Sequence, residues 1–140
     1  MIRVIQQNCA RSYEWNIAAL ETGVERIADV VCLQEPPREE GGIGISHSTY
    51  EIKKRKRVWT AILKGSGLVV DEQTELSIGD NDDVIATDVK RRGENITRII
   101  NIYNQKDTQS GERPVQKLNW QRVIRQGSTG LAGDFNTQST

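Results

Sequence analysis

The stretch VVCLQEPP, residues 30–37, decides the fold of this chain. Its first four residues are apolar, which is typical of a strand that is buried on both faces of a sheet. The two prolines that follow end this strand. Residues 2–8 predict a second strand upstream, and a helical pattern lies between the two. A strand, a helix and a strand within this length predict two parallel strands that lie side by side.

The intervening helix has a recognisable start and an apolar face. Ser12 is placed to cap its N-terminus. Apolar residues then recur at spacings of three and four, which predicts that this face packs on the sheet; they are Tyr13, Ile17, Leu20, Val24 and Ile27. Gly23 lies inside the helix, where glycine is expected to cost about 1 kcal/mol relative to alanine.

Downstream of this unit the pattern predicts mostly strands. Paired strands are expected at residues 50–54 and 58–63, after a glycine-rich loop at residues 39–48, and a short strand at residues 68–70. Residues 84–89 and 96–103 predict an antiparallel hairpin that turns around Gly93. A helix between Pro114 and Gly127 and a final strand at residues 129–132 complete the expected α/β domain, which covers residues 1–140.

The charge balance limits the classes of function. Lys plus Arg and Asp plus Glu both number 19, so net charge gives no reason to expect nucleic acid or a membrane as partner. Locally, five consecutive cations are either a solvated turn or a contact for DNA phosphates; they are Lys53, Lys54, Arg55, Lys56 and Arg57. Trp59 is expected in the core. The turn at residues 90–92 would extend the basic patch if the two hairpins are adjacent.

The cysteines and the apolar runs indicate a soluble intracellular protein. Cys9 and Cys32 fall in or beside core strands, and we expect buried free thiols without a disulfide or a zinc site. No apolar run approaches the length of a membrane span, and the first residues do not form a signal peptide. We expect no membrane partner and no small-molecule cofactor, and the nucleus is one candidate location.

Polar side chains stand at the ends of four predicted strands. They are Asn8, Glu35, Tyr103 and Asp134, with Asn136 just beyond the last. Each has an ordinary structural explanation when taken singly, as a turn residue, a strand cap or a core aromatic. Together they lie where ligands gather in α/β sheets, outside the carboxyl ends of the strands. Oxygen ligands without a His/Cys cluster favour Mg²⁺ (or Mn²⁺).

These residues also carry a resemblance to a known family. Asn8, LQE at residues 33–35, NIYN at residues 101–104 and GDFN at residues 133–136 resemble, in this order, the motifs of the endonuclease/exonuclease/phosphatase superfamily. The apurinic-like endonuclease domain of non-LTR retrotransposons is the most similar branch. The resemblance implies a sandwich of two mixed β-sheets flanked by helices. It also implies in-line hydrolysis of a phosphodiester without a covalent enzyme intermediate.

The resemblance assigns a role to each site residue. Glu35 would hold the divalent metal, with Asn8 beside it. Asp134 would orient or deprotonate the attacking water, and Asn136 would contact the scissile phosphate. Tyr103 would donate a hydrogen bond to that phosphate as charge builds on its oxygens.

The chain departs from the family pattern at its C-terminal end. The family's last segment supplies a Ser-Asp-His-like element, whereas this chain stops at Thr140. We therefore expect a partial sandwich, a single incomplete domain whose C-terminal segment is missing and whose activity suffers without the catalytic histidine. The only histidine, His47, is expected to be a surface loop residue and not a substitute. Gln138 stands where retrotransposon members tend to carry a histidine.

Three hypotheses for function remain open. The first is a DNA-nicking endonuclease domain of a retroelement, present as a truncated fragment that is either active or inactive. The second is a phosphatase of the same fold that acts on phosphoinositide or sphingolipid headgroups. The third is a non-catalytic remnant that at most binds nucleic acid. The local runs of cations favour DNA as the partner.

Overall fold

A computed structural model of the chain describes residues 2–39, 41, 44–72, 82–103 and 128–134, the last of these as backbone. The helix predicted between residues 114 and 127 lies outside the described residues, as do Asn136 and Gln138.

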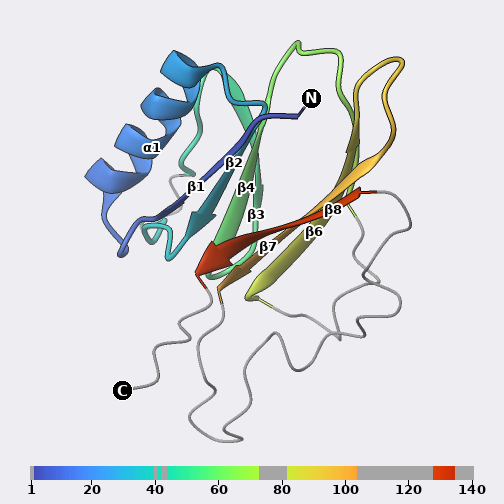
Figure 1. Cartoon of the computed structure of the whole chain (residues 1–140). Helices are drawn as coiled ribbons and strands as arrows, with labels where there is room; N and C mark the ends of the chain where they lie inside the picture. The colour runs from blue at the N-terminus through green and yellow to red at the C-terminus, as the bar shows by residue number, and fades with distance from the viewer. Residues whose placement is uncertain (1, 40, 42–43, 73–81, 104–127, 135–140) are drawn as a thin grey trace, which may run out of the picture.

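The described chain forms two four-stranded sheets that pack face to face, with one helix on the outer face of the first sheet (Figure 1). The first sheet has the order β1-β2-β4-β3, from β1 (Val4–Asn8), β2 (Val30–Gln34), β3 (Tyr50–Lys54) and β4 (Val58–Leu63). The second has the order β5-β6-β7-β8, from β5 (Val69–Glu72), β6 (Val84–Lys90), β7 (Thr97–Tyr103) and β8 (Ser128–Asp134). Helix α1 (Tyr13–Arg26) connects β1 to β2. This arrangement confirms the predicted two-sheet α/β sandwich.

The strand pairing follows the sequence predictions closely. β1 and β2 are parallel neighbours, and all five residues of β2 are buried, as the continuous apolar run predicts. β3–β4 and β6–β7 are antiparallel pairs, so both predicted hairpins are confirmed. β8 pairs with β7 in parallel and is longer than predicted, and β5 begins and ends later than predicted.

The buried face of α1 differs from the predicted one. Ser12 caps the helix as expected, since its hydroxyl accepts a hydrogen bond from Trp15 N at 3.2 Å. The residues that the helix buries are mostly small or polar: Asn16, Ala19, Leu20 and Gly23. Tyr13 and Ile27, at the two ends of the predicted apolar stripe, are 54% and 66% exposed. The prediction is confirmed for Leu20, which is fully buried, and is wrong for Tyr13, Val24 and Ile27, because the buried face of the helix is centred on Ala19, Leu20 and Gly23.

Gly23 marks a close approach of the helix to the sheet. A Cβ atom at this position would lie 2.7 Å from Tyr50 Oη and 2.8 Å from Val31 Cγ2. Tyr50 is itself fixed, because it is 1% exposed and its hydroxyl donates to Ala28 O at 2.8 Å. The glycine is therefore required by packing, and its cost in helix propensity is secondary.

Gly23→Ala is expected to lower the free energy of unfolding by about 1–2 kcal/mol, since overpacking outweighs the gain in helix propensity. Chemical denaturation measures this change. Ala18→Gly, at an exposed position of the same helix, measures the propensity effect alone and is expected to cost about 1 kcal/mol. A Gly23→Ala protein that is more stable than the wild type would refute the close packing.

Candidate active site

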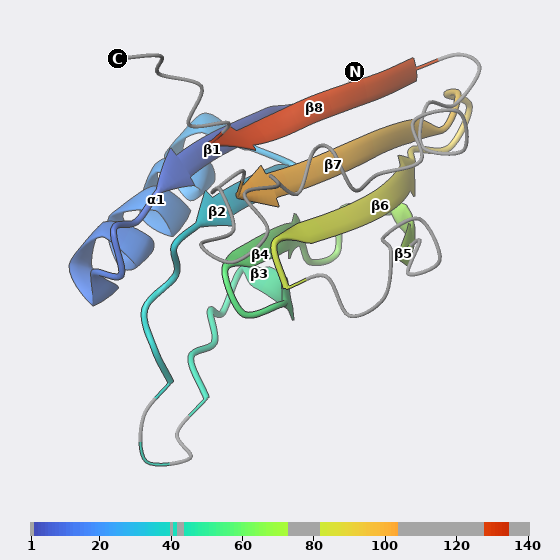
Figure 2. The same ribbon diagram turned by 90° about the horizontal axis from the view of Figure 1, so that it is seen from below.

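The ends of four strands gather at one end of the sandwich. Asn8 and Gln34 are partners in register at the ends of β1 and β2, and Tyr103 and Asp134 are partners in register at the ends of β7 and β8. Figure 2 shows the arrowheads of these four strands pointing the same way, and β8 contacts both β1 and β2. The site is therefore shared between two facing sheets, whereas the sequence suggested a single sheet edge.

A hydrogen bond between the sheets forms the centre of the site. Tyr103 Oη donates to Glu35 Oε1 at 2.8 Å, across a sequence separation of 68 residues. Tyr103 is 6% exposed, and its backbone N–H donates to Asp83 O at 2.9 Å. The predicted convergence of Glu35 and Tyr103 is confirmed by this contact.

The loops after β1 and β2 hold Asn8 and Glu35 in place. Glu35 adopts a left-handed backbone conformation with φ of 48°, which turns the chain away from the strand. Its backbone N–H donates to Arg57 O at 3.0 Å, and its carbonyl accepts from Arg11 N at 2.8 Å. Asn8 Oδ1 accepts from Ala10 N at 2.8 Å. A left-handed non-glycine residue costs about 1–3 kcal/mol, and such costs concentrate at functional sites.

The other predicted catalytic residues are placed only in part. The backbone of Asp134 lies opposite Tyr103 in the β7–β8 pair, and Asn136 lies outside the described residues. The structure thus brings together Asn8, Glu35, Tyr103 and the backbone of Asp134. Their individual roles in catalysis stay predictions.

A basic cleft of about 780 Å³ opens beside Glu35. One wall is the segment that follows β2, and the other is the turn between β3 and β4. Most of the charged residues along it are cations, and the residues that line it are Arg11, Glu35, Pro36, Pro37, Arg38, Glu39, Arg55, Lys56, Arg57 and Trp59. Such a cleft suits an extended anion that passes the Glu35 carboxylate.

The five-cation run divides between this cleft and its rim. Arg55, Lys56 and Arg57 line the cleft, while Lys53 and Lys54 do not. Lys54 Nζ lies 2.7 Å from Glu39 Oε2 and 4.7 Å from the ring centroid of Trp59. Trp59 is 3% exposed, as its predicted core position requires.

Two of the three arginine and lysine side chains in the turn are held by carboxylates. Arg55 Nη2 lies 3.0 Å from Glu72 Oε1, and Arg57 forms a two-bond ion pair with Asp83. The hydrogen bond to Asp83 raises the pKa of Arg57 above its usual value. Lys56 is exposed, and within the described part of the chain no ion pair is found for it. Lys56 is therefore the cation of the run best placed to meet a ligand.

Sequence reasoning missed two cations of the cleft, Arg11 and Arg38. Each follows a predicted site residue by three positions, Arg11 after Asn8 and Arg38 after Glu35. Because loops that follow the strand ends surround a site in such folds, this spacing could have indicated both residues.

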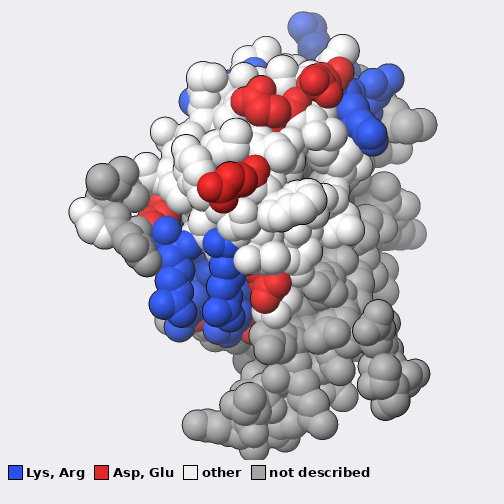
Figure 3. Space-filling model, turned by 90° about the vertical axis from the view of Figure 1, so that its left-hand side faces the viewer, with Lys and Arg blue, Asp and Glu red and all other residues white. Residues whose placement is uncertain are grey.

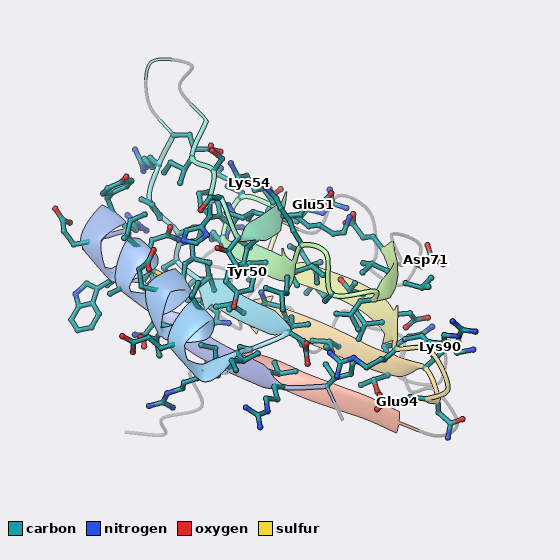
Figure 4. The ribbon with its side chains drawn as sticks, turned by 90° about the horizontal axis from the view of Figure 1, so that it is seen from above. Tyr50, Glu51, Lys54, Asp71, Lys90 and Glu94 are labelled. Atoms are coloured by element: carbon teal, nitrogen blue, oxygen red, sulfur yellow. The ribbon has the colours of Figure 1, made fainter. Side chains whose placement is uncertain are left out.

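The turn at residues 90–92 does not extend the basic patch. Arg91 Nη2 contacts Asp29 Oδ1 at 2.5 Å, beside the start of β2 and so at the opposite end of the sandwich. Figure 4 shows Lys90 well apart from Lys54, and on the face seen in Figure 3 the lysine and arginine side chains gather in separate groups. The two turns are not adjacent, so the condition set for a joint basic patch is not met.

His47 lies in the loop after β2, as predicted, but its side chain is more enclosed than a surface position implies. Its side chain is only 9% exposed, and Nε2 lies 3.0 Å from Glu21 Oε1 on α1. Its Nδ1 accepts from Thr49 N at 3.1 Å, and its ring packs near that of Tyr50. His47 thus joins the loop after β2 to α1 and is absent from the cleft lining.

The two cysteines confirm the sequence prediction, since both are free and buried. Burial raises the pKa of Cys9 to about 11 and that of Cys32 to about 12. Both thiols therefore stay protonated at neutral pH, and a protonated thiol is a poor metal ligand.

The donors at the site suit a hard divalent cation. No group of three or more His, Cys, Asp or Glu side chains that could hold a metal is found among residues 2–39, 41, 44–72 and 82–103. The described donors are one carboxylate, Glu35, and one amide oxygen, that of Asn8. Mg²⁺ commonly binds through one or two carboxylates and keeps several waters. A carboxylate has about four acceptor positions, so Glu35 could bind an ion as well as Tyr103.

Comparison with known proteins places this fold. No protein-family model and no curated protein matches the sequence. Among solved structures, the chain is similar to the endonuclease domain of TRAS1, a telomere-specific non-LTR retrotransposon, with a TM-score of 0.71 at 17% identity. The match covers 99% of this chain and 62% of that chain.

The fold and the site together define a class of protein, namely a two-sheet α/β sandwich with a polar site at the ends of its strands. The particular fold is that of a retrotransposon endonuclease domain, and the resemblance found from the sequence motifs is confirmed at the level of the fold. This chain spans less than two thirds of that neighbour's length.

Proposed function

We propose that this chain is a metal-dependent endonuclease domain that nicks DNA by hydrolysing a phosphodiester bond. The observation that carries the proposal is the hydrogen bond between Tyr103 and Glu35, which joins the strand ends of the two sheets beside a basic cleft. The fold shared with a retrotransposon endonuclease domain supports it.

In the proposed reaction each site residue has a separate role. A divalent ion at Glu35 and Asn8 would neutralise charge that develops on the phosphate and orient the leaving oxygen. Asp134 accepts a proton from the attacking water, and Asn136 holds the phosphate. The hydroxyl of Tyr103 carries a single proton. The Tyr103 hydroxyl therefore donates its hydrogen bond to Glu35 in the free protein. During the proposed reaction it donates to the phosphate instead.

The cleft favours DNA over a single phosphorylated headgroup. Within the described residues, Arg55 and Arg57 have carboxylate partners, whereas no ion pair is found for Arg11, Arg38 or Lys56. Cations spaced along an open cleft suit successive phosphates of a nucleic-acid strand, because phosphate neutralisation dominates non-specific affinity. No helix in the described part of the chain has the length and apolar character needed to cross a membrane.

Lys56→Ala is expected to weaken binding of duplex DNA and to reduce the slope of log K against log salt concentration by about one. Fluorescence anisotropy with labelled DNA in EDTA measures this without cleavage. Lys53→Ala is the matched control, because Lys53 belongs to the same run but does not line the cleft. If the salt dependence of DNA binding has the same slope for Lys56→Ala and Lys53→Ala, the DNA does not bind in this cleft.

Three substrates separate the candidate functions. Nicking of supercoiled plasmid with Mg²⁺ or Mn²⁺, stopped by EDTA, is the expected result. Release of phosphate from soluble inositol phosphates, with the plasmid intact, would instead indicate a phosphatase. DNA binding without cleavage at any metal concentration would indicate a non-catalytic protein.

A further inference from the structure

A pair of buried amide side chains joins the two sheets next to the candidate site. Gln34 Nε2 donates to Asn101 Oδ1 at 2.8 Å, and both residues are 0% exposed. Asn101 Nδ2 donates in turn to Trp59 O at 2.8 Å and to Thr60 Oγ1 at 3.2 Å. We call the Gln34–Asn101 pair the amide bridge. It links β7 of one sheet to β2 and β4 of the other.

The amide bridge lies next to the contact between Tyr103 and Glu35, on the side toward the interior of the sandwich. Gln34 directly precedes Glu35, and Asn101 precedes Tyr103 by two residues. Alternate residues of a strand point to the same face, so Asn101 and Tyr103 both project from β7 toward the facing sheet. The two contacts therefore span the same pair of strands.

We propose that Gln34 and Asn101 are positioning residues, which set the spacing of the two sheets so that Tyr103 meets Glu35. The proposal rests on the proposed function for its catalytic consequence. Hydrogen bonds between planar amides are directional, whereas apolar contacts permit sliding. A bridge of this kind fixes one relative position of the two strand ends.

The cost of the bridge argues against a purely stabilising role. Gln34 Oε1 is buried and has no hydrogen-bond partner in the described part of the structure. A buried polar atom without a partner is unfavourable, and apolar side chains of similar volume would fill the same space without it. The apolar residues on the same faces of these strands, Cys32 and Ile99, belong to one buried cluster and show that the core between the sheets accepts such side chains.

Gln34→Met tests the proposal, because it keeps the volume of the side chain and removes its hydrogen bond. We expect it to lower kcat for plasmid nicking about 10-fold or more, with KM little changed, since small misplacements of catalytic groups are costly. In a Tyr103→Phe background the same substitution is expected to change kcat by less than about twofold, because the two residues act through one contact. Val89→Ala, a core substitution in β6 near the other end of the sandwich, controls for lost stability.

A second readout does not depend on catalysis. The chain has three tyrosines, so ¹³Cζ-labelled tyrosine gives three NMR signals, and Tyr103→Phe identifies the relevant one. Gln34→Met is expected to shift the Tyr103 signal, and Val89→Ala is expected to leave it in place. Thr60→Val removes one acceptor of Asn101 and serves as the milder variant if Gln34→Met does not fold.

Each outcome decides the proposal. A shifted Tyr103 signal together with non-additive losses of kcat supports it. An unmoved signal, or a loss of kcat that is the same with and without the Tyr103 hydroxyl, overturns it. If the wild-type protein cleaves no phosphodiester, the proposed function fails, and the Tyr103 signal alone then decides whether the amide bridge positions this side chain.

Discussion

Glu35→Gln is expected to lower the rate of plasmid nicking by about 10²–10³-fold while the protein stays folded. The substitution keeps the size of the side chain and an oxygen that can accept the hydrogen bond from Tyr103 Oη. It removes only the negative charge, which is the charge proposed to hold the divalent ion. Loss of one electrostatic stabiliser of the transition state typically costs a factor of this size. Conversion of supercoiled to open-circular plasmid across a range of Mg²⁺ concentrations measures it.

Glu39→Gln is the matched control for this experiment. Glu39 lines the same cleft, but its carboxylate binds Lys54 Nζ at 2.7 Å, and this hydrogen bond lowers the pKa of Glu39. We expect its nicking rate to stay within a few-fold of the wild type. If the two substitutions lower the rate equally, the effect reflects the charge of the cleft in general, and Glu35 has no special role. A Glu35→Gln protein with full activity would refute the site.

Arg98→Met is expected to lower the free energy of unfolding by about 3–5 kcal/mol, the largest effect on stability that we predict. Arg98 Nε and Nη2 donate to the two carboxylate oxygens of Asp88 at 2.7 and 2.9 Å. The two side chains are 8% and 10% exposed. Removal of the guanidinium takes two charge-assisted hydrogen bonds from the buried Asp88 carboxylate, which is strongly unfavourable. Chemical denaturation measures the loss.

Two further variants separate this explanation from lost packing. The double substitution Arg98→Met/Asp88→Leu removes both charges and is expected to be more stable than Arg98→Met alone. Arg55→Met breaks a much more exposed pair, with side chains 36% and 28% exposed, and is expected to cost less than about 1 kcal/mol. A double variant as unstable as Arg98→Met would show that lost packing, and not the loss of this ion pair, accounts for the destabilisation.

Much of the fold could be predicted from the sequence, because its determinants are local. The apolar run that ends at Leu33 and the prolines after Glu35 define β2, and the cap at Ser12 defines the start of α1. Parallel pairing of β1 and β2 follows from the connecting helix. The position of Glu35 at a strand end was predictable for the same reason.

The features that could not be predicted depend on how distant segments pack. The close approach of α1 to the sheet depends on Tyr50 and Val31, which lie beneath Gly23. The amide bridge forms because β2 and β7 lie opposite each other in the two sheets. The spacing of apolar residues does not specify which strands face each other. A polar residue such as Asn101 between Ile100 and Ile102 in an apolar strand is a signal, but it does not name its partner.

The central claim is that the strand ends of both sheets form one metal-dependent phosphodiesterase site. The position of a bound divalent ion tests this claim most directly. Crystals soaked with Mn²⁺ give an anomalous difference peak wherever the ion binds. We expect one dominant peak at about 2.1 Å from a carboxylate oxygen of Glu35, beside Asn8 and absent from Glu35→Gln crystals. A dominant peak at another group of carboxylates, with none at Glu35 under saturating Mn²⁺, would contradict the proposed site.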